Sequence, residues 1–367
     1  MKIALIDTDY MESMEATYRK TPNLKSKSYD EQSRTFASEV FGIKHHYAKN
    51  LSEMGHEIIA ITPNNEIMQK QWARENNVSY SSGLFQNTPV LKKWFKPNWL
   101  EKILIAQIKK YAPDVVYSLV IELKNNRLMW NIKKECKLLA VQISAKLPNP
   151  KYFAPYDLMV TSLPHFTDYF RKCGKNSELL KLGFESTILK KLQKNKCQYK
   201  VTHIGGYGPI HNDRNIVLEK VADKIKMDTW GYATENLDKE SSILKNYHGG
   251  VWGLDMFNVL YNSKMTITGH IKKVARNYAN NMTLYEATGC GCLLVTDMKD
   301  NLGEIFEIGK EVVAYKDADD LVEKIKYYLE HEDERAKIAK AGQERTLKDH
   351  SYKKRSEELI SILEKYL

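Results

Sequence analysis

The segment Tyr278–Asp297, YANNMTLYEATGCGCLLVTD, contains two features that could carry chemistry. One is a single carboxylate, Glu286, in a run of apolar and small residues, and the other is the pair Cys290 and Cys292. A Cys-x-Cys pair normally holds a metal only together with two further Cys or His ligands, and none lies close in sequence. The spacing therefore favours two small thiols that pack where a helix meets a strand.

Glu286 calls for a different interpretation. The pattern predicts a helix from about Tyr278 or Ala279 to Gly289, which places Glu286 three residues before the helix end. An acid near a helix C-terminus is unfavourable with respect to the helix dipole. A carboxylate kept there is suited to accept hydrogen bonds from a pair of ribose hydroxyl groups. We therefore predict that Glu286 binds a ribose.

A glycine-rich turn, HIGGYGP, follows a predicted strand and precedes a helix expected to begin near Asn212 or Asp213. Gly205 and Gly206 allow the backbone to approach a phosphate, and the helix N-terminus favours its negative charge. Arg214 falls in the first turn, where a cation opposes the helix dipole, and a bound phosphate would explain its position. The turn matches neither a dinucleotide fingerprint nor a Walker A loop, so by itself it is weak evidence.

Trp252 lies in a second glycine-rich loop, YHGGVWGLD, which also precedes a predicted helix. Glycines on both sides of the indole fit a backbone that approaches a flat ligand, and they equally fit a tight turn. Taken alone, the loop favours the turn.

His270 ends a later predicted strand, and Lys272, Lys273 and Arg276 follow it in a predicted loop. Cations at the carboxyl end of a parallel strand lie where doubly wound sheets bind ligands. A solvated basic loop is the alternative, and the sequence does not decide between them.

In the first half, Asp7 and Asp9 follow the first predicted strand, at the end where doubly wound sheets place functional residues. His45 and His46 lie together in a predicted helix. Adjacent helical residues point about 100° apart, so only one of the two can face a small ligand. We retain Asp7, Asp9 and His45 as candidate catalytic residues, although a single histidine in such a helix is more often structural.

The elements that position these residues alternate between strands and helices. In the first half, helices are predicted over residues 33–54 (before Gly55), 97–113 and 164–174. The predicted strands are KIALID, HEIIAIT, DVVYSLV, KLLAVQI and YDLMVTS, then YKVTHIGG, KMDTWGY, KMTITGH, CLLVTD and EVVAY. Such alternation predicts an α/β protein with parallel sheets covered on both faces. Two series of strands imply two doubly wound, Rossmann-like domains.

The boundary between the two series is expected in the polar, lysine-rich stretch 184–200. We therefore predict an N-terminal domain over residues 1–185 and a C-terminal domain over 198–349. Residues 332–366 are highly charged, helical in period and followed by no strand, so they must pack on a domain that is already built, with a last helix at about 350–367.

The composition and the first residues of the sequence indicate where in the cell the protein is expected. No apolar run approaches the roughly 18 residues of a membrane span, and the start MKIALIDTDY is typical of a buried strand, not of a signal peptide. The five cysteines contain no Cys-x-x-Cys pair. We expect a cytoplasmic protein with reduced thiols.

Charge is unevenly distributed along the chain. Residues 1–200 hold 32 Lys and Arg against 19 Asp and Glu, whereas residues 201–367 hold 24 against 27. A basic half fits a partner such as an anionic membrane surface, a phosphorylated acceptor or a nucleic acid. A solubilising lysine-rich surface explains the same numbers. Nucleic-acid binding is disfavoured, because no recognised module is present and aromatics are not interleaved with the basic residues.

The block YANNMTLYEATGCGCLLVTDMKDNLGEIFEIGKEVVAY resembles the C-terminal domain of group 1 glycosyltransferases of the GT-B fold. It is most similar to the spore-maturation-protein-like (CgeB-like) branch. The resemblance continues upstream in YDLMVTSLPHFTDYFRKCGKNSELLKLGFE and downstream in HEDERAKIAKAGQERTLKDHSYKKR. It covers most of residues 112–356 and is specific in 277–315.

The wider group carries a Glu-x7-Glu motif at its donor site, followed by Ala and a Cys-Gly or Ser-Gly turn. The second acid corresponds to Glu286, which is followed here by Ala287 and Cys290. The resemblance thus implies that Glu286 binds the nucleotide ribose. Tyr278 stands where the group has its first acid, which leaves the donor sugar and the retaining outcome undecided.

The resemblance also implies contacts to the rest of the donor. Asn280 and Asn281 are the candidates for contacting the sugar in place of the missing acid. The Gly205-Gly206 turn is similar to the loop that faces the diphosphate and the acceptor. The candidate diphosphate-binding cations are Arg214, Lys272, Lys273 and Arg276.

The implied architecture is two domains facing across a cleft, with the last helix crossing back to the N-terminal domain. The implied reaction transfers a sugar from a nucleotide diphosphate sugar to a hydroxyl acceptor. No metal or other cofactor is expected, because cations and helix N-termini stabilise the leaving diphosphate in such sites. The basic first half fits a lipid-linked or anionic acceptor at the inner face of the membrane. The alternatives are a nucleotide-sugar epimerase of the same fold and a non-catalytic nucleotide-sugar-binding protein.

Overall fold

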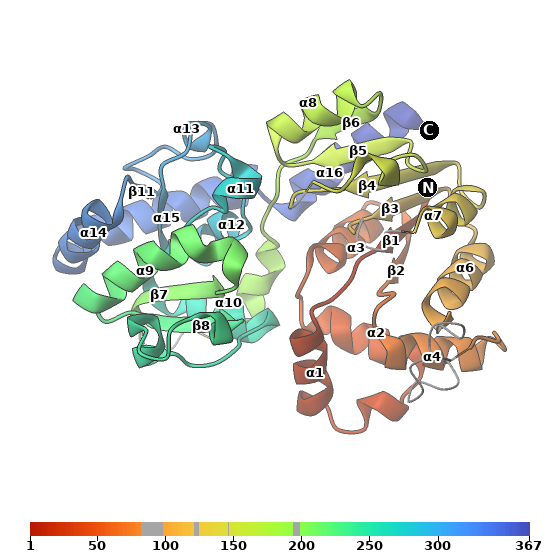
Figure 1. The fold of residues 1–367 in the computed structure, drawn as a ribbon, viewed down its shortest axis with the longest axis horizontal. Coiled ribbons are helices and arrows are strands. Elements are labelled where there is room, and N and C mark those ends of the chain that lie inside the picture. The colour runs from red at the N-terminus through yellow and green to blue at the C-terminus, as the bar shows by residue number, and fades with distance from the viewer. Residues whose placement is uncertain (82–97, 121–124, 146, 194–198) are drawn as a thin grey trace. The chain divides into compact units, whose positions relative to one another are not determined.

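The computed structural model describes residues 1–81, 98–120, 125–145, 147–193 and 199–367 (Figure 1). Pro97 and Cys197, which entered the sequence interpretation, lie outside these residues. Two compact units divide the chain. Unit 1 comprises Met1–Ile143, Leu147–Leu180 and Ser356–Leu367, and unit 2 comprises Ser144–Lys146 and Lys181–Arg355.

Unit 1 is built on a six-stranded parallel sheet of order β2-β1-β3-β4-β5-β6, which can be followed in Figure 1. Its strands are β1 (Lys2–Ile6), β2 (Glu57–Ile61), β3 (Val115–Ser118), β4 (Leu138–Gln142), β5 (Leu158–Thr161) and β6 (Asn176–Leu179). β3, β4 and β5 are buried along their whole length, as expected of parallel strands covered on both faces. The five strands predicted in this half are confirmed, and the polar edge strand β6 was not predicted.

Helices surround this sheet. They are α1 (Met11–Lys20), α2 (Tyr29–Ser38), α3 (Ile43–Glu53), α4 (Glu66–Glu75), α6 (Trp99–Tyr111), α7 (Asn126–Lys133) and α8 (Pro164–Lys172), with most of α16 (Tyr352–Tyr366). Tyr366 of α16 donates a hydrogen bond to Glu178 of β6 at 2.6 Å. The last helix thereby adds to unit 1, although the chain enters it from unit 2.

The single helix predicted over residues 33–54 is wrong, because two helices, α2 and α3, occupy this region. Ser28 and Glu31 form a capping box that begins α2 earlier than predicted. Val40 and Gly42 then take φ angles of +52° and +89°, in the left-handed region that ends a right-handed helix. The apolar period continues across this break, so periodicity alone could not reveal it.

Unit 2 contains a five-stranded parallel sheet of order β11-β10-β9-β7-β8. The strands are β7 (Tyr199–Gly206), β8 (Asp228–Tyr232), β9 (Ser263–Thr268), β10 (Leu293–Asp297) and β11 (Val313–Tyr315), and all five were predicted. The helices are α9 (Asn212–Lys224), α10 (Gly253–Tyr261), α11 (Lys272–Ala275), α12 (Thr283–Gly289), α13 (Leu302–Ile305), α14 (Ala318–Glu330) and α15 (Glu332–Asp349). The described residues of both units also form short 3-10 helices: η1 (Leu24–Ser26), η2 (Pro150–Tyr152), η3 (Ser186–Lys191), η4 (Pro209–His211), η5 (Thr234–Asn236) and η6 (Ser242–Asn246).

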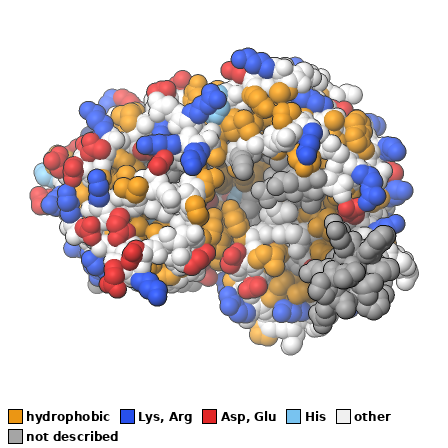
Figure 2. All heavy atoms as spheres, in the orientation of Figure 1, with side chains coloured by type: hydrophobic (Ala, Val, Ile, Leu, Met, Phe, Trp, Pro, Cys, Tyr) orange, Lys and Arg blue, Asp and Glu red, His pale blue; other side chains and the backbone are white. Residues whose placement is uncertain are grey.

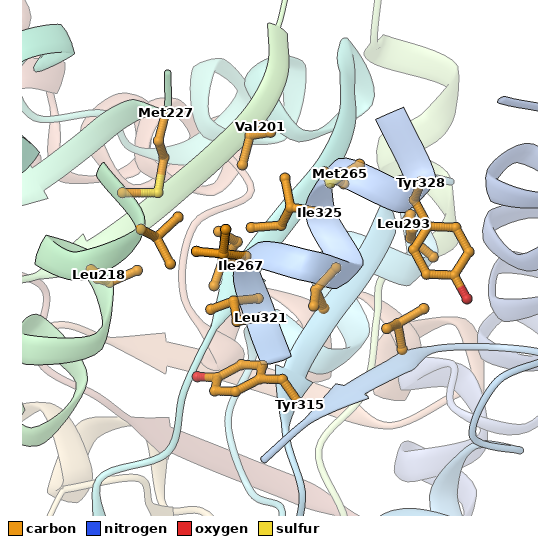
Figure 3. Close-up of a cluster of buried hydrophobic side chains, with 14 of the residues drawn as sticks. Val201, Leu218, Met227, Met265, Ile267, Leu293, Tyr315, Leu321, Ile325 and Tyr328 are labelled. Carbon is orange, nitrogen blue, oxygen red and sulfur yellow. The ribbon is translucent and has the colours of Figure 1, made fainter. Parts of the chain in front are cut away.

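The core of unit 2 forms between this sheet and the helix α14. Figure 3 shows Leu321 and Ile325 of α14 beside Met265 and Ile267 of β9, all in one buried cluster. Leu321 and Ile325 are four residues apart and therefore share one face of the helix. The carboxylate of Asp317 caps the start of α14. The predicted α/β class with two parallel-sheet domains is confirmed.

Two predictions around the acidic segment need correction. Lys272–Ala275 form the short helix α11, not a loop, and α12 begins at Thr283, not near Tyr278. Asn281 sets the start of α12, because its side chain accepts a hydrogen bond from the backbone of Leu284 at 3.0 Å. Glu286 is therefore the middle residue of a seven-residue helix, and the argument from the helix dipole does not apply to it.

Gly289, the last residue of α12, allows an aromatic ring to approach the helix. A Cβ atom added there would lie 2.4 Å from the ring of Phe184. We expect Gly289→Ala to destabilise the fold by about 1–3 kcal/mol through overpacking, as measured by urea denaturation. The matched control is Gly303→Ala, where a Cβ meets nothing within 4 Å. Equal stabilities for the two variants would contradict this packing account.

Candidate functional site

The carboxyl end of β7 carries the predicted glycine turn. A Cβ added at Gly206 would lie 2.7 Å from the ring of Tyr232, and one at Gly205 would lie 3.0 Å from Nε2 of His203 and 3.3 Å from Nη1 of Arg214. Side chains from β8 and α9 therefore press directly on the backbone of this turn. A side chain at Gly206 would displace the ring of Tyr232, and one at Gly205 would crowd His203 and Arg214.

Arg214 lies in the first turn of α9, as predicted, but its side chain turns back toward the strand. The guanidinium donates a hydrogen bond to the carbonyl oxygen of Gly206, and Cγ would lie 3.1 Å from a Cβ at Gly269. Nε is buried and has no hydrogen-bond partner among the described residues. Arg214 is thus held between the ends of β7 and β9 with one donor unused.

Other buried polar atoms near Arg214 also lack partners within the described chain. They are His203 Nε2, His211 Nδ1, Asn215 Oδ1 and His270 Nε2. Burial, and next the charge of Arg214, lowers the pKa of His203 to about 3 and that of His211 to about 4. Buried polar groups in native proteins nearly always find a partner, so a cluster of unpartnered ones at one sheet edge indicates a ligand.

Asp297 ends β10 and holds two side chains of the same edge. Its Oδ1 lies 2.6 Å from Nδ1 of His270, and its Oδ2 lies 2.9 Å from Nζ of Lys299. Burial acts to raise the pKa of Asp297, but the hydrogen bonds and charges of His270 and Lys299 outweigh it and lower the pKa to about 2. Asp297 and Lys299 were not singled out from the sequence, because the contact of Asp297 with His270 joins the ends of two neighbouring strands, β9 and β10, across 27 positions of the chain.

Glu286 is partly exposed, and its carboxylate makes no hydrogen bond or ion pair within the part of the chain that the structure describes. Burial raises its pKa to about 7. Cys290 and Cys292, four and six residues later, are buried free thiols at the junction of α12 and β10. No group of three or more potential metal-ligating side chains occurs in the described residues.

The remaining predicted residues of unit 2 are either exposed cations or side chains that already make contacts within the chain. Lys272, Lys273 and Arg276 are exposed in and after α11, and no ion pair engages them within the described ranges. Asn281 is occupied inside the chain, since it caps α12 and its amide lies 3.4 Å from Thr268 Oγ1.

Asn280 and Trp252 also make contacts within unit 2. The amide of Asn280 donates to the carbonyl of Ser144 at 3.2 Å, which uses only its nitrogen. Trp252 stacks on Tyr232, with ring centroids 5.6 Å apart and planes 26° apart. This stack stands at the carboxyl end of β8, next to the glycine turn.

In unit 1, Asp7 and Asp9 form a cluster with Lys44, a residue that sequence reasoning missed. The Nζ atom of Lys44 is buried, hydrogen-bonded to Thr62 Oγ1 and 3.7 Å from Oδ1 of Asp9. Burial raises the pKa of Asp7 to about 6, against the opposing charge of Lys44. A lysine on an amphipathic helix normally points to water, so nothing in the sequence marked Lys44.

His45 is not joined to this cluster by any hydrogen bond or ion pair that the described residues show. Burial, and next Lys44 and His46, lowers the pKa of His45 well below its usual range. His46 is buried. The structure therefore brings Asp7 and Asp9 together and does not connect His45 to them.

The raised pKa of Glu286 makes folding depend on pH. Between its ordinary pKa of 4.5 and about 7, the folded chain binds more protons at this carboxyl than the unfolded chain does. Its contribution to stability is therefore present at low pH and lost as pH rises through about 7. Glu286→Gln cannot ionise, so its melting temperature relative to the wild type should be higher at pH 8 than at pH 5. The measurement is thermal unfolding at both pH values. An equal difference in melting temperature between Glu286→Gln and the wild type at pH 5 and pH 8 would contradict this expectation.

The chain was compared with families and structures of known proteins. Residues 214–361 match the family model described as glycosyl transferase-like. No curated protein sequence matches the chain. Among solved structures, the chain is similar to HepE of Anabaena in complex with UDP and glucose, at 10% identity, covering 100% of both chains, with a TM-score of 0.64.

Two further solved structures share this fold. Sucrose-phosphate synthase of Thermosynechococcus elongatus is 10% identical, with 100% of this chain and 98% of that chain covered and a TM-score of 0.62. AviGT4, a glycosyltransferase of avilamycin A biosynthesis, is 12% identical with the same coverage and a TM-score of 0.57. The chain shares the GT-B fold of these solved structures, and residues 214–361 are similar to the glycosyl transferase-like family.

Proposed function

We propose that the protein is a glycosyltransferase that moves a sugar from a nucleotide diphosphate sugar to a hydroxyl group of an acceptor. One observation carries this proposal: unpartnered donors and acceptors gather at the carboxyl edge of the sheet of unit 2, and those of Arg214, Asn215 and His270 lie within the segment that matches the glycosyl transferase-like family.

We assign the diphosphate to the glycine turn and the positively charged residues of the site. Arg214 offers Nε, the Gly205-Gly206 turn lies before α9, and Lys272, Lys273 and Arg276 add exposed positive charge. Backbone N–H groups and cations of this kind stabilise the negative charge that develops on a leaving diphosphate. We propose on this basis that no metal ion is required.

The nucleoside is assigned to Glu286 and to the aromatic stack. A carboxylate can accept hydrogen bonds from both ribose hydroxyl groups, and Glu286 has no competing partner among the described residues. Trp252 stacked on Tyr232 offers a flat apolar face to a base. Because HepE was solved with UDP and with UDP-glucose, we propose uridine diphosphate sugars as the first donors to test.

In the proposed reaction the acceptor oxygen bonds to the anomeric carbon while the bond from that carbon to the diphosphate breaks. The diphosphate leaves with the electron pair, and the proton of the acceptor hydroxyl passes to a base. Asp7 is the better candidate base, because its pKa of about 6 suits proton transfer near neutral pH. Asp9 is paired with Lys44 instead. Asp7→Asn should therefore lower transfer and leave donor binding unchanged.

The acceptor is proposed to be anionic or lipid-linked, at the inner face of the membrane, because residues 1–200 carry the excess of basic residues. No helix of the described residues is long and apolar enough to cross a membrane. The face shown in Figure 2 carries basic and acidic side chains interspersed, without one continuous basic field. Sedimentation with liposomes tests this proposal: binding should rise with anionic lipid content, and binding independent of it would refute the membrane assignment.

The finer family placement, in the spore-maturation-protein-like branch, is also proposed from the sequence of the acidic segment. Full-length relatives of that branch with an aromatic residue at the position of Tyr278 would support it, and an acid there in all of them would oppose it. An epimerase or a non-catalytic binding protein is not favoured by the family match.

Calorimetry and product analysis test the proposed function. The wild type should bind UDP-sugars, and Glu286→Gln should weaken binding by about 1–3 kcal/mol, since a charged hydrogen bond to ribose is lost. Transfer to acceptors should persist in EDTA. An isomeric nucleotide sugar formed without acceptor would identify an epimerase, and donor binding without any product would identify a binding protein.

A further inference from the structure

Arg276 lies in a backbone conformation that residues with a side chain rarely adopt. Its φ and ψ angles are +51° and −118°, and the N–H of Tyr278 donates a hydrogen bond to the carbonyl oxygen of Ala275 at 2.9 Å. These features define a type II′ turn with Arg276 at its first central position, where glycine is the usual residue. An arginine there creates backbone strain that glycine would avoid.

The loop that leaves β10 holds this turn in place. The backbone N–H of Asp300 donates to the carbonyl oxygen of Asn277 at 3.0 Å, and the side chains of the same two residues are also hydrogen-bonded. The amide of Asn301 accepts a hydrogen bond from the backbone N–H of Ala279 and donates one to its carbonyl oxygen. These contacts fix the residues that follow Arg276, so the surrounding chain maintains the strained conformation.

No contact within the described residues explains an arginine at this position. The side chain of Arg276 is exposed, and its guanidinium makes no hydrogen bond or ion pair in the part of the chain that the structure describes. Lys272, four residues earlier, is also exposed, and like charges at this helical spacing repel each other. Residues 271–282 contain three cations and no acid. A bound anion would compensate this repulsion.

The turn lies at the edge of the sheet where we propose that the donor binds. Arg276 follows the carboxyl end of β9, and the residues that clamp the turn, Asp300 and Asn301, follow the carboxyl end of β10. The other neighbour of β9 is β7, which carries the Gly205-Gly206 turn. Because parallel strands end at the same edge, a donor bound there has its anionic groups on the same side of unit 2 as Arg276.

We propose that Arg276 binds an anionic group of the donor through two parallel hydrogen bonds, and that the chain retains the strained turn because it fixes this side chain at the edge of the sheet. A guanidinium matches the paired oxygens of a phosphate or a carboxylate, whereas an ammonium acts as a point charge. The group is the diphosphate or the carboxylate of an acidic sugar such as a uronic acid. The inference rests on the proposed function and gives Arg276 a specific contact in place of general positive charge.

Calorimetry of the full chain with UDP, UDP-glucose and UDP-glucuronic acid tests this contact. Arg276→Gln should weaken binding roughly tenfold, through the loss of a charged hydrogen bond. Arg276→Lys should recover only part of the affinity, because it keeps the charge and loses the paired donors. An equal loss for all three ligands identifies the diphosphate as the bound group, and a loss confined to UDP-glucuronic acid identifies the sugar carboxylate.

The matched control for these measurements is Arg19→Gln. Arg19 is an exposed arginine in the last turn of α1, in unit 1, where a cation suits the helix dipole. This variant loses the same charge from the chain as Arg276→Gln does. It should bind all three ligands as the wild type does.

Thermal unfolding tests the strain separately from the binding. Arg276→Gly and Arg276→Ala both remove the guanidinium, but only glycine adopts this turn without strain. Arg276→Gly should therefore melt about 2–4 °C above Arg276→Ala. It should bind the donor no better than Arg276→Ala does, since both lack the group that contacts the anion.

The inference would be overturned, with the proposed function intact, if Arg276→Gln bound all three ligands as tightly as the wild type. It would also fail if Arg276→Lys did so, because charge alone would then be sufficient. A melting temperature of Arg276→Gly below that of Arg276→Ala would refute the strained turn. By contrast, a wild type that binds none of the three ligands would refute the proposed donor site itself.

Discussion

The parallel alignment of the strands in unit 2 is the constraint on which the site depends. Every strand from β7 to β11 ends at the same edge of the sheet, so residues far apart in sequence meet there without any long connection. Gly206, His270 and Asp297 each stand at or just beyond such an end. The buried core of unit 2 holds these ends in place.

Burial at this edge has an electrostatic cost. Arg214 is enclosed next to two histidines whose pKa values are lowered, and Glu286 carries a raised pKa in the helix α12. Among the described residues, Asp297 has compensating partners in His270 and Lys299. Buried groups that lack such partners destabilise the protein when no ligand is bound. They favour the binding of a ligand that brings the missing charges and hydroxyl groups. A nucleotide diphosphate sugar supplies both kinds in one molecule.

In unit 1, charged side chains likewise gather at the carboxyl end of a parallel strand, β1. Asp9 has its partner in the buried Lys44, whereas Asp7 is left partly exposed with a pKa of about 6. The two aspartates were recognised from their place after the first strand. Lys44 was not, because its inward orientation follows from the break at Val40 and Gly42 that starts a new helix.

The sequence by itself determined the strands other than β6, the α/β class and the presence of a helix before β10, because runs of apolar residues bounded by glycine and proline depend only on local chemistry. Glu286 was singled out by its predicted place near a helix end, which the structure does not bear out, and independently by the family resemblance. Helix boundaries such as that of α12, and the pairing of His270 with Asp297, were decided only by the tertiary structure. A start at Thr283 depends on where Asn281 is held against β9, and the His270–Asp297 bond joins residues 27 positions apart. No local pattern records either contact, since both arise only when parallel strands bring their ends together.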